Sequence, residues 1–336
     1  MLFYIFYIIF SLLLIFLSRR FNFLIHSNNL SHKRLTSYSK VSILGGILVL
    51  IFLIFALNIN NYFFFIPFFI LGLLSDINYL TNPKKRILIQ IIFIILFIIF
   101  LKIKIFKTNF FILDYALNNN YFNIIFVSFC LLVLMNGCNF IDGLNTLLIG
   151  YILIIFLTIY FILPGINFNK DLIKSFLFIL LVLYFLNLFN LLYLGDSGSY
   201  ILALFSGYLL IDIANINPFM SPFYIVLLLW YPCFENLFSI IRRKNNLYSS
   251  FKPDNKHLHQ LIYIFVKNKF YQNNILANIL SASIINLYNF FLIMFSVKFI
   301  YKTKFIIFLI IINIILYLFI YYYLNKKIKK FILKEV

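Results

Sequence analysis

Apolar runs separated by short polar loops follow one another along the whole chain. A helix needs about 20 mostly apolar residues to cross a bilayer, so the pattern predicts an all-α fold, a polytopic membrane helix bundle with about 10–11 transmembrane helices. The run at 62–74 is short and the run at 199–213 is weak, so ten spans remain an alternative to eleven. The eleven runs fall near residues 2–17, 42–58, 62–74, 87–103, 121–135, 147–163, 173–191, 199–213, 222–240, 277–297 and 304–324.

Nothing in this pattern divides the chain. No internal repeat and no linker long enough to separate domains is visible, so we expect residues 1–336 to form a single integral membrane domain. The first apolar run ends at Ser18-Arg19-Arg20, and its positive charge follows the run instead of preceding it. Together with the lack of a small-residue cleavage site, this order predicts a first transmembrane helix and not a signal peptide.

Composition decides which residues carry information. Hydrophobic residues make up 64% of the chain and charged residues 11%, which excludes a water-soluble domain of this length. Lys and Asn are common, whereas the nine acidic residues, ten glycines and four histidines are scarce. Clusters of the scarce residues therefore weigh more than a single Lys or Asn. The three cysteines show no C-x-x-C spacing and are expected to be small apolar residues.

The formal net charge of +19 comes from basic residues in the loops. Their position beside apolar runs fits contact with anionic lipid headgroups and argues against a nucleic-acid partner. With eleven spans, 20 of the 28 Lys and Arg residues fall on one side of the membrane and 8 on the other. The positive-inside rule places the richer side in the cytoplasm. This predicts a multi-pass protein of the inner (plasma) membrane, with its N-terminus outside and its C-terminus cytoplasmic.

Scarce acidic and histidine residues gather on the predicted cytoplasmic side. Three of the acids stand beside glycines at helix ends, which is expected of a functional site and not of scattered charge neutralisation. The opposite side holds Asp114, Asp171 and Asp212. The residues on the cytoplasmic side are His32, Asp76, Asp142, Asp196, Asp254, His257 and His259.

Two loops near the N-terminus combine basic residues with glycines or a carboxylate. Ser31-His32-Lys33-Arg34 precedes Gly45-Gly46, and this segment is either a membrane anchor with a helix-packing glycine pair or a cradle for an anionic lipid head. Asp76 ends an apolar run shortly before Lys85 and Arg86. A carboxylate at the membrane boundary is costly unless it is solvated or paired. Asp76 is therefore either a site residue or the partner of one of these two cations.

A polar segment at residues 136–145, without Lys or Arg, interrupts an otherwise apolar stretch. Asn136, Asn139 and Asp142 recur every three residues, and Asn145 continues the series. On a helical turn they would share one face and present amides and a carboxylate together. Such a face can read a nucleobase edge or complete the shell of a hard cation. A merely polar membrane turn is the alternative.

Small residues surround a carboxylate at Leu194-Gly195-Asp196-Ser197-Gly198-Ser199, between two apolar runs. Gly195 and Ser197 allow the backbone to approach a phosphate closely, and the start of the next helix favours an anion. Asp196 suits Mg²⁺, which takes one or two carboxylates together with substrate phosphate oxygens. The segment lacks G-x-S-x-G and is not a serine-hydrolase elbow.

The last large polar stretch contains Lys252-Pro253-Asp254-Asn255-Lys256-His257-Leu258-His259-Gln260. His257 and His259 could ligate zinc, but the chain offers few further soft ligands, and a pyrophosphate clamp amid basic residues is favoured. The loops together hold carboxylates for Mg²⁺, a phosphate contact, an amide-rich face and a basic histidine loop. This set predicts Mg²⁺-dependent transfer of a phosphate-linked group from a soluble nucleotide to a lipid.

These motifs, in this order and spacing, resemble the polyprenyl-phosphate N-acetylhexosamine-1-phosphate transferases, the WecA/TagO/MraY superfamily of the glycosyltransferase 4 family. The resemblance implies transfer of an N-acetylhexosamine-1-phosphate from a UDP-sugar to undecaprenyl phosphate, which gives undecaprenyl-diphosphate sugar and UMP and starts a cell-surface glycan of the lipopolysaccharide or cell-wall type. It also implies Mg²⁺, with Mn²⁺ as an alternative. The matching segments are residues 72–90, 136–147, 194–200 and 251–260, with a weaker likeness in the first loop.

The resemblance places metal and nucleotide at the amide-rich segment and the glycine-flanked carboxylate. Asp196 looks like the principal Mg²⁺ ligand, with Asn139 beside it. Asp142 and Asn145 match positions tied to nucleotide binding or catalysis. The residues expected to bind substrate are Asn136, Asn139, Asn145, Gly195 and Ser197.

The catalytic residues that the resemblance implies are Asp76, Arg86, Asp142, His257 and His259. Asp76 matches the second residue of an Asp-Asp pair near the lipid phosphate, and Arg86 matches the basic residue downstream of it. The two histidines match a motif close to the diphosphate. The assignment requires that Asp142 and Asp196 lie at the same end of the bundle and close enough to share one ion-and-substrate cluster.

Three positions depart from the family pattern. Ser75 stands where many members have the first Asp of the pair, which puts a mechanism with two adjacent carboxylates in question. Gln260 replaces a third histidine, and Asn145 replaces an Asp. These differences favour the O-antigen and wall-teichoic-acid type over the phospho-MurNAc-pentapeptide transferases, which are the alternative enzyme. No segment can be singled out as the sugar pocket.

A lipid-linked sugar transporter is the alternative from another functional class. Transporters place polar groups near mid-membrane in broken helices, whereas the scarce polar residues of this chain lie at predicted helix ends. The enzyme is therefore favoured. Its expected partners are the two substrates and membrane lipids, with no nucleic acid, and a homodimer stays open.

Overall fold

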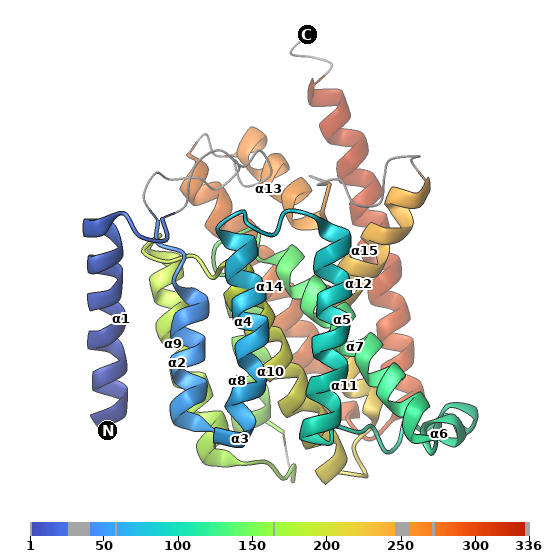
Figure 1. The fold of residues 1–336 in the computed structure, drawn as a ribbon. Helices are drawn as coiled ribbons and strands as arrows, with labels where there is room; N and C mark the ends of the chain where they lie inside the picture. Colours follow the sequence, from blue (N-terminus) through green and yellow to red (C-terminus); the bar gives the residue numbers. More distant parts are fainter. Residues whose placement is uncertain are drawn as a thin grey trace.

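The predicted all-α fold class is confirmed by the computed structural model of the chain (Figure 1). The structure describes residues 2–25, 41–57, 59–163, 165–245, 256–270 and 273–332. Within these ranges the regular backbone is helical, and the only β-type pairings are isolated bridges that join Ser42 to Ile25 and to Leu192. The first loop's His32 segment and Asp254 lie outside the described residues.

Each of the eleven predicted apolar runs falls on a helix. The helices that carry them are α1 (Leu2–Phe21), α2 (Gly45–Ala56), α4 (Ile66–Asp76), α5 (Pro83–Leu101), α7 (Asn120–Ile141), α8 (Leu147–Phe161), α9 (Lys170–Leu188), α10 (Gly195–Ile216), α11 (Pro222–Leu228) with α12 (Trp230–Asn245), α14 (Asn274–Ser296) and α15 (Thr303–Ile332). The shorter helices α3 (Ile59–Tyr62), α6 (Phe111–Leu117) and α13 (Leu258–Lys269) lie between them. One predicted run, 222–240, is broken into two helices that meet at a bend of 72°.

The length and apolar composition of the helices indicate a multi-pass membrane protein. Within the described residues six helices, α1, α7, α9, α10, α14 and α15, are long and apolar enough to cross a bilayer, or seven if the bent pair α11 and α12 forms one span. α2, residues 63–76 and α8 are apolar but shorter. Helices suit the bilayer because they satisfy their backbone hydrogen bonds internally. The count of ten or eleven crossings stays a prediction.

Asparagines mark the starts of several helices. The side chains of Asn82, Asn119, Asn169 and Asn273 each accept a hydrogen bond from a backbone N–H in the first turn of α5, α7, α9 and α14. Such caps satisfy N–H groups that have no partner inside the helix. Much of the polar content at the membrane boundary is therefore explained by helix termination, without reference to function.

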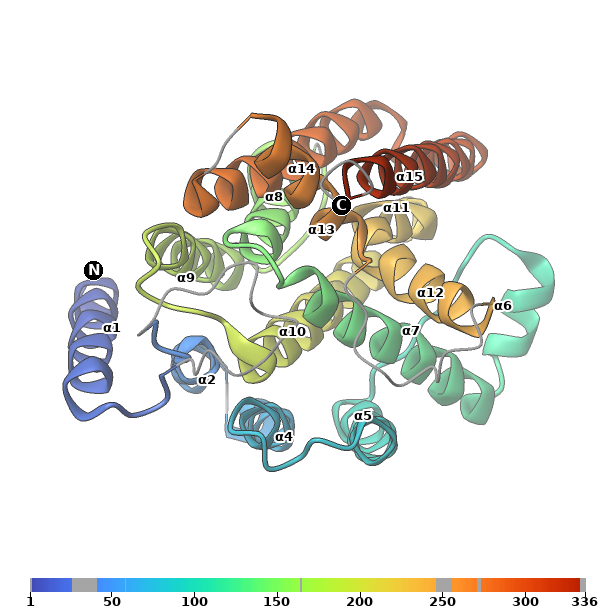
Figure 2. The ribbon, with the colours of Figure 1, turned by 90° about the horizontal axis from the view of Figure 1, so that it is seen from above.

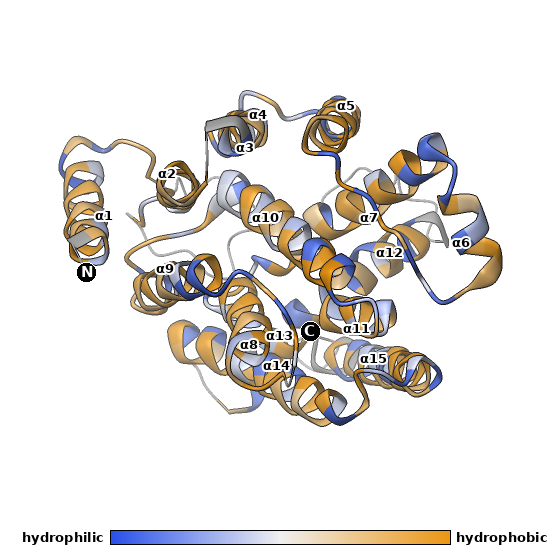
Figure 3. Ribbon diagram, turned by 90° about the horizontal axis from the view of Figure 1, so that it is seen from below, coloured by the Kyte–Doolittle hydropathy of each residue, from blue (hydrophilic) through white to orange (hydrophobic). Residues whose placement is uncertain are grey.

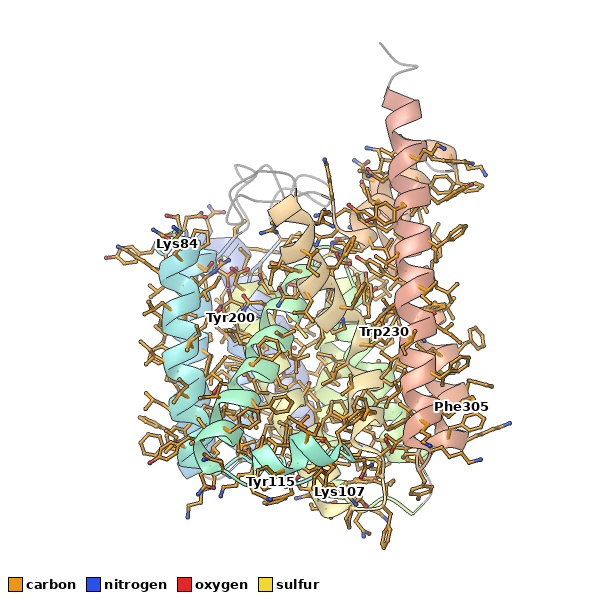
Figure 4. All side chains as sticks on the ribbon, turned by 90° about the vertical axis from the view of Figure 1, so that its right-hand side faces the viewer. Lys84, Lys107, Tyr115, Tyr200, Trp230 and Phe305 are labelled. Atoms are coloured by element: carbon orange, nitrogen blue, oxygen red, sulfur yellow. The ribbon has the colours of Figure 1, made fainter. Side chains whose placement is uncertain are left out.

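The bundle has two chemically distinct ends. α1 begins at the lower end and α15 finishes at the upper end, where α13 lies across the bundle (Figure 1). Lys84 lies at the upper end and Lys107 at the lower end (Figure 4). Seen from below, hydrophobic residues cover most of the helices, and hydrophilic residues concentrate in the connections (Figure 3). The described loops that we assign to the cytoplasm all lie at the upper end.

α10 runs through the middle of the bundle and is packed against α2, α4 and α7 (Figure 2). Its first turns are close to neighbouring backbones because glycines face them. A Cβ at Gly72 of α4 would lie 2.3 Å from Ser197 Cα, and a Cβ at Gly46 of α2 would lie 2.4 Å from Ser197 Oγ. The Gly45-Gly46 pair therefore serves helix packing, as one of the two predicted readings had it.

Gly72→Ala is expected to destabilise the protein by about 1–3 kcal/mol, because the new methyl group meets the backbone of α10 and helices must separate to admit it. Gly207→Ala is the matched control, since its Cβ would meet only the ends of Leu131 and Leu134 side chains, at 2.8 and 2.9 Å. Thermal unfolding in detergent measures both variants. An equal fall in Tm would contradict the importance of close α4–α10 packing.

Candidate active site

Donors from three helices converge on the carboxylate of Asp196, at the upper end of the bundle. Arg86 Nη1 of α5 lies 3.1 Å from Asp196 Oδ2, and Ser75 Oγ of α4 donates to the same oxygen at 2.5 Å. Asn139 Nδ2 of α7 donates to Oδ1 at 2.8 Å. The Arg86 and Asp196 side chains are 24% and 15% exposed, so the ion pair sits at a partly open surface.

Asp76 holds the first turn of α10 in place. Its Oδ1 accepts the backbone N–H of Asp196 at 2.8 Å, and its Oδ2 accepts the Ser197 N–H at 3.1 Å and the Ser197 hydroxyl at 2.8 Å. The first N–H groups of a helix lack partners within the helix and lie at the positive end of its dipole, so a carboxylate is stabilised there. The anion at this helix N-terminus is thus Asp76, where we expected a substrate phosphate.

Gly195 is required by this contact. Its φ of +73° is a conformation that L side chains rarely adopt, and a Cβ would lie 2.7 Å from Asp76 Oδ2. The glycine lets the chain reverse into α10 while the carboxylate covers it. The predicted phosphate-binding roles of Gly195 and Ser197 stay predictions.

The polar series from Asn136 to Asn145 continues past the end of α7, so only its first members lie within the helix. Asn139 reaches Asp196, but Asn136, one turn below, donates to Gln90 Oε1 and Leu132 O, each at 3.0 Å. α7 ends at Ile141. The final member of the series therefore lies beyond the helix and follows a different path.

Asn145 is buried and connects the α7–α8 turn to two other helices. Its N–H donates to Asn278 Oδ1 at 2.9 Å, and its Nδ2 donates to Asn187 O at 3.0 Å and to Asn190 Oδ1. These bonds fix the turn that follows Asp142 against α9 and α14. The structure thus shows that Asn145 stabilises this turn, and the substrate-binding role expected for it stays a prediction.

The two histidines of α13 dock against the segment that carries Asp142. Their rings are stacked with centroids 5.6 Å apart and an interplanar angle of 11°. A Cβ at Gly143 would lie 2.6 Å from His259 Nε2, so this glycine admits the imidazole. Neither ring nitrogen of His259 has a hydrogen-bond partner in the described part of the chain.

Burial keeps His259 uncharged. The side chain is fully buried, and this lowers the pKa of the imidazole to about 3. The neighbouring His257 acts in the same direction, and Glu235 acts against it. At neutral pH His259 is therefore an uncharged imidazole.

Glu235 is a site residue that the sequence reading missed. It lies on α12, is fully buried, and is joined to His257 Nδ1 at 2.9 Å and to the Tyr317 hydroxyl at 2.7 Å. It went unnoticed because it falls inside the apolar run at 222–240. One signal was available: a carboxylate within an apolar run is costly and marks function by default.

Phe140 joins the two groups of polar residues. It follows Asn139 in α7, its ring lies 5.0 Å from that of His257, and the Arg243 guanidinium lies 5.6 Å above it. Asp142 stands three residues beyond Asn139, which contacts Asp196, so the two carboxylates lie at the same end of the bundle. The condition that both carboxylates lie at one end of the bundle is met, and their sharing of one ion-and-substrate cluster stays a prediction.

The coordination shell of a metal ion at this site would have to be completed by oxygens of the substrate. Within the described residues no group of three or more His, Cys, Asp and Glu could hold an ion. Asp196 offers a carboxylate, and Asn139 offers an Oδ1 that accepts no hydrogen bond from the described chain. Mg²⁺ takes few protein oxygens and fills its shell with water and phosphate oxygens. A carboxylate and an amide oxygen are donors that both Mg²⁺ and Mn²⁺ take, and an ion bound here together with a diphosphate stays a prediction.

Part of the chain matches a known protein family. Residues 61–214 match the model of a family described as glycosyl transferase family 4. The matched segment contains Asp76, Arg86, Asn139, Asp142 and Asp196, and it ends before Glu235 and the histidines. No curated protein matches the chain.

Proposed function

The chain belongs to the glycosyltransferase family 4 superfamily, whose members transfer a sugar-1-phosphate to a polyprenyl phosphate in a membrane, and we propose that this chain uses a UDP-N-acetylhexosamine and undecaprenyl phosphate. The products would be undecaprenyl-diphosphate sugar, which starts a cell-surface glycan, and UMP. The observation that carries the proposal is the convergence of donors from α4, α5 and α7 on the carboxylate of Asp196 in α10.

An unused donor beside this carboxylate supports an anionic substrate. Arg86 Nε is buried and has no acceptor in the described chain. A buried donor without an acceptor is costly. A phosphate oxygen bound beside α5 would satisfy Arg86 Nε, and this fits the expected position of the lipid phosphate near Asp76 and Arg86.

The proposed reaction is an in-line displacement at phosphorus. An oxygen of the lipid phosphate forms a bond to the β-phosphorus of the UDP-sugar, the bond from that phosphorus to the bridging oxygen breaks, and UMP leaves with the electron pair. Asp196 and Asn139 would hold Mg²⁺, which when bound neutralises charge on the diphosphate. Arg86 contributes a fixed cation, and Asp76 keeps Asp196 at its place on α10.

Ser75 is compatible with this chemistry. A phosphate monoester has a second pKa of about 6 and is largely ionised at neutral pH. Its oxygen therefore needs no carboxylate to remove a proton before it attacks. Ser75 instead donates to Asp196 and accepts from Arg86 Nη1 at 2.8 Å, so it links the cation to the carboxylate without adding charge.

The O-antigen and wall-teichoic-acid type remains our preferred assignment, with the site facing the cytoplasm. Lys84, from one of the basic loops that indicate this orientation, lies at the upper end (Figure 4), and Arg86 two residues further on pairs with Asp196. The positions of Asp76, Asp142 and Asp196 at helix ends argue for an enzyme and against a transporter, which would place such groups near mid-membrane.

The test is UMP release from purified protein in detergent with Mg²⁺. We expect release with UDP-GlcNAc or a related UDP-N-acetylhexosamine, dependent on undecaprenyl phosphate and matched by a lipid-linked product. Turnover with UDP-MurNAc-pentapeptide alone would favour the alternative transferase. UMP release that does not depend on polyprenyl phosphate would overturn the proposal, as would the lack of UMP release with a panel of UDP-sugars.

A further inference from the structure

Glu235 is a fully buried carboxylate between α12, α13 and α15. Taking a charge out of water is costly unless hydrogen-bond donors replace the water. Three donors do so here: His257 Nδ1 at 2.9 Å and, more weakly, the Leu258 N–H at 3.4 Å meet Oε1, and the Tyr317 hydroxyl meets Oε2 at 2.7 Å. The residue is thus held in one orientation by two neighbouring helices.

This arrangement selects one form of the His257 ring. A carboxylate only accepts hydrogen bonds, so Nδ1 carries the hydrogen and donates it to Glu235. Nε2 is then the nitrogen left for a ligand, and it makes no hydrogen bond within the described chain. Carboxylates behind a histidine fix the tautomer and the ring orientation in the same way at metal and catalytic sites.

The ring is also fixed from its other sides. Phe140 lies against it with a centroid distance of 5.0 Å, and His259 is stacked 5.6 Å away. The His257 backbone N–H donates to Gln260 Oε1 at 3.1 Å, so the residue caps α13 as well. A ring supported in this way can present Nε2 in one direction without further ordering.

Tyr317 extends the support to the last helix of the bundle. Its ring packs edge-on against Phe234 and Phe238 of α12, with centroids 4.9 and 5.5 Å away. The hydroxyl thereby reaches Glu235 from α15 without freedom to turn elsewhere. The described charged and titratable groups around Glu235 and His257 are Tyr231 and Arg242 of α12, His259 of α13, and Tyr317 of α15.

We propose that Glu235, oriented by Tyr317, is a positioning residue that holds the hydrogen of His257 Nδ1 and so presents Nε2 to the diphosphate of the nucleotide sugar. The identity of this ligand rests on the proposed function, whereas the hydrogen bond and the tautomer do not. Glu235 itself touches no substrate in this scheme and acts through the histidine.

Glu235→Gln tests the tautomer directly, because its shape is kept while its bonding changes. The Tyr317 hydroxyl would donate to the new amide oxygen and leave the amide nitrogen toward His257, which turns Nδ1 into an acceptor. Nitrogen-15 NMR of histidine-labelled full-length protein in lipid nanodiscs should therefore show a protonated Nδ1 in the wild type and its loss in the variant. Retention of that signal in Glu235→Gln would overturn the inference.

Kinetics give the second readout. We expect Glu235→Gln to lower kcat about 10- to 100-fold, the loss typical when the carboxylate that orients a metal-binding histidine is replaced. The Tm should stay unchanged. The carboxylate of Glu235→Asp also only accepts hydrogen bonds, so this variant should recover part of the rate. Tyr317→Phe should lower kcat less than Glu235→Gln does. A fall in Tm with normal kcat and an unchanged NMR signal would mean that Glu235 serves the fold alone, and would overturn the inference.

Tyr151→Phe is the matched control. Its hydroxyl is buried in the same bundle and donates to Leu228 O at 2.7 Å, away from the histidines. We expect neither the tautomer nor kcat to change in this variant. If the wild type transfers no sugar phosphate but its tautomer still depends on Glu235, the proposed function fails and the positioning of His257 stands.

Discussion

Asp196→Asn is expected to lower kcat about a thousandfold while the bundle stays folded. The carboxylate balances Arg86, accepts from Ser75 and Asn139, and is the strongest oxygen donor available to a hard cation. An amide has the same shape but no charge, and its nitrogen would face a donor. Removing one preorganised charge contact at a transferring group costs rates of this order.

The measurement is UMP release per mole of folded protein, with Tm in detergent as the check on folding. Asp212→Asn is the matched control, since Asp212 lies on the same helix near its opposite end. We expect that control to retain normal kcat. Full activity in Asp196→Asn would remove Asp196 from the catalytic cluster.

Asp76→Asn is expected to reduce both stability and activity. Three donors point at the two carboxylate oxygens, and an amide nitrogen placed among them would repel at least one of the donors. We expect a loss of about 1–3 kcal/mol in the free energy of unfolding. The first turn of α10 should then loosen and carry Asp196 away from Arg86, so kcat should fall about a hundredfold.

Asp114→Asn separates these two effects. Asp114 also accepts a backbone N–H and a hydroxyl, both from Thr108 at 2.6 Å, but near the lower end of the bundle. The Asp114→Asn protein should be less stable than the wild type and keep the wild-type kcat. If Asp76→Asn kept the wild-type Tm and lost only activity, Asp76 would act on the substrate directly and not through α10.

The fold could be predicted because the bilayer leaves few choices. An apolar run of about 20 residues must become a helix, since no other backbone satisfies its hydrogen bonds in lipid. The meeting of residues 76, 139 and 196 could be anticipated because helices with alternating directions bring every second loop to one end. The break at residue 229 was also open to prediction, because Pro232 in the first turn of α12 cannot donate a helical hydrogen bond to Leu228 and so kinks the helix.

The partners of individual side chains were beyond the sequence. Asp76 has a lysine and an arginine close by in the chain, but its oxygens accept hydrogen bonds from the start of α10, 120 residues away. Asn145 continues a polar series of period three, but the helix ends before it and its amide turns inward. Such outcomes depend on helix packing, which periodicity does not specify.

The contact between Glu235 and Tyr317 sets a lower limit on the length of a working fragment. The family match ends at residue 214. The His257 imidazole, however, is held by Glu235 of α12, and Glu235 in turn accepts a hydrogen bond from Tyr317, near the middle of α15. A chain that ends where the family match ends would keep every carboxylate discussed for magnesium. It would lose Glu235 and Tyr317, which orient His257, and the histidines themselves. Truncations that stop short of residue 317 should therefore give inactive protein, even where membrane insertion succeeds.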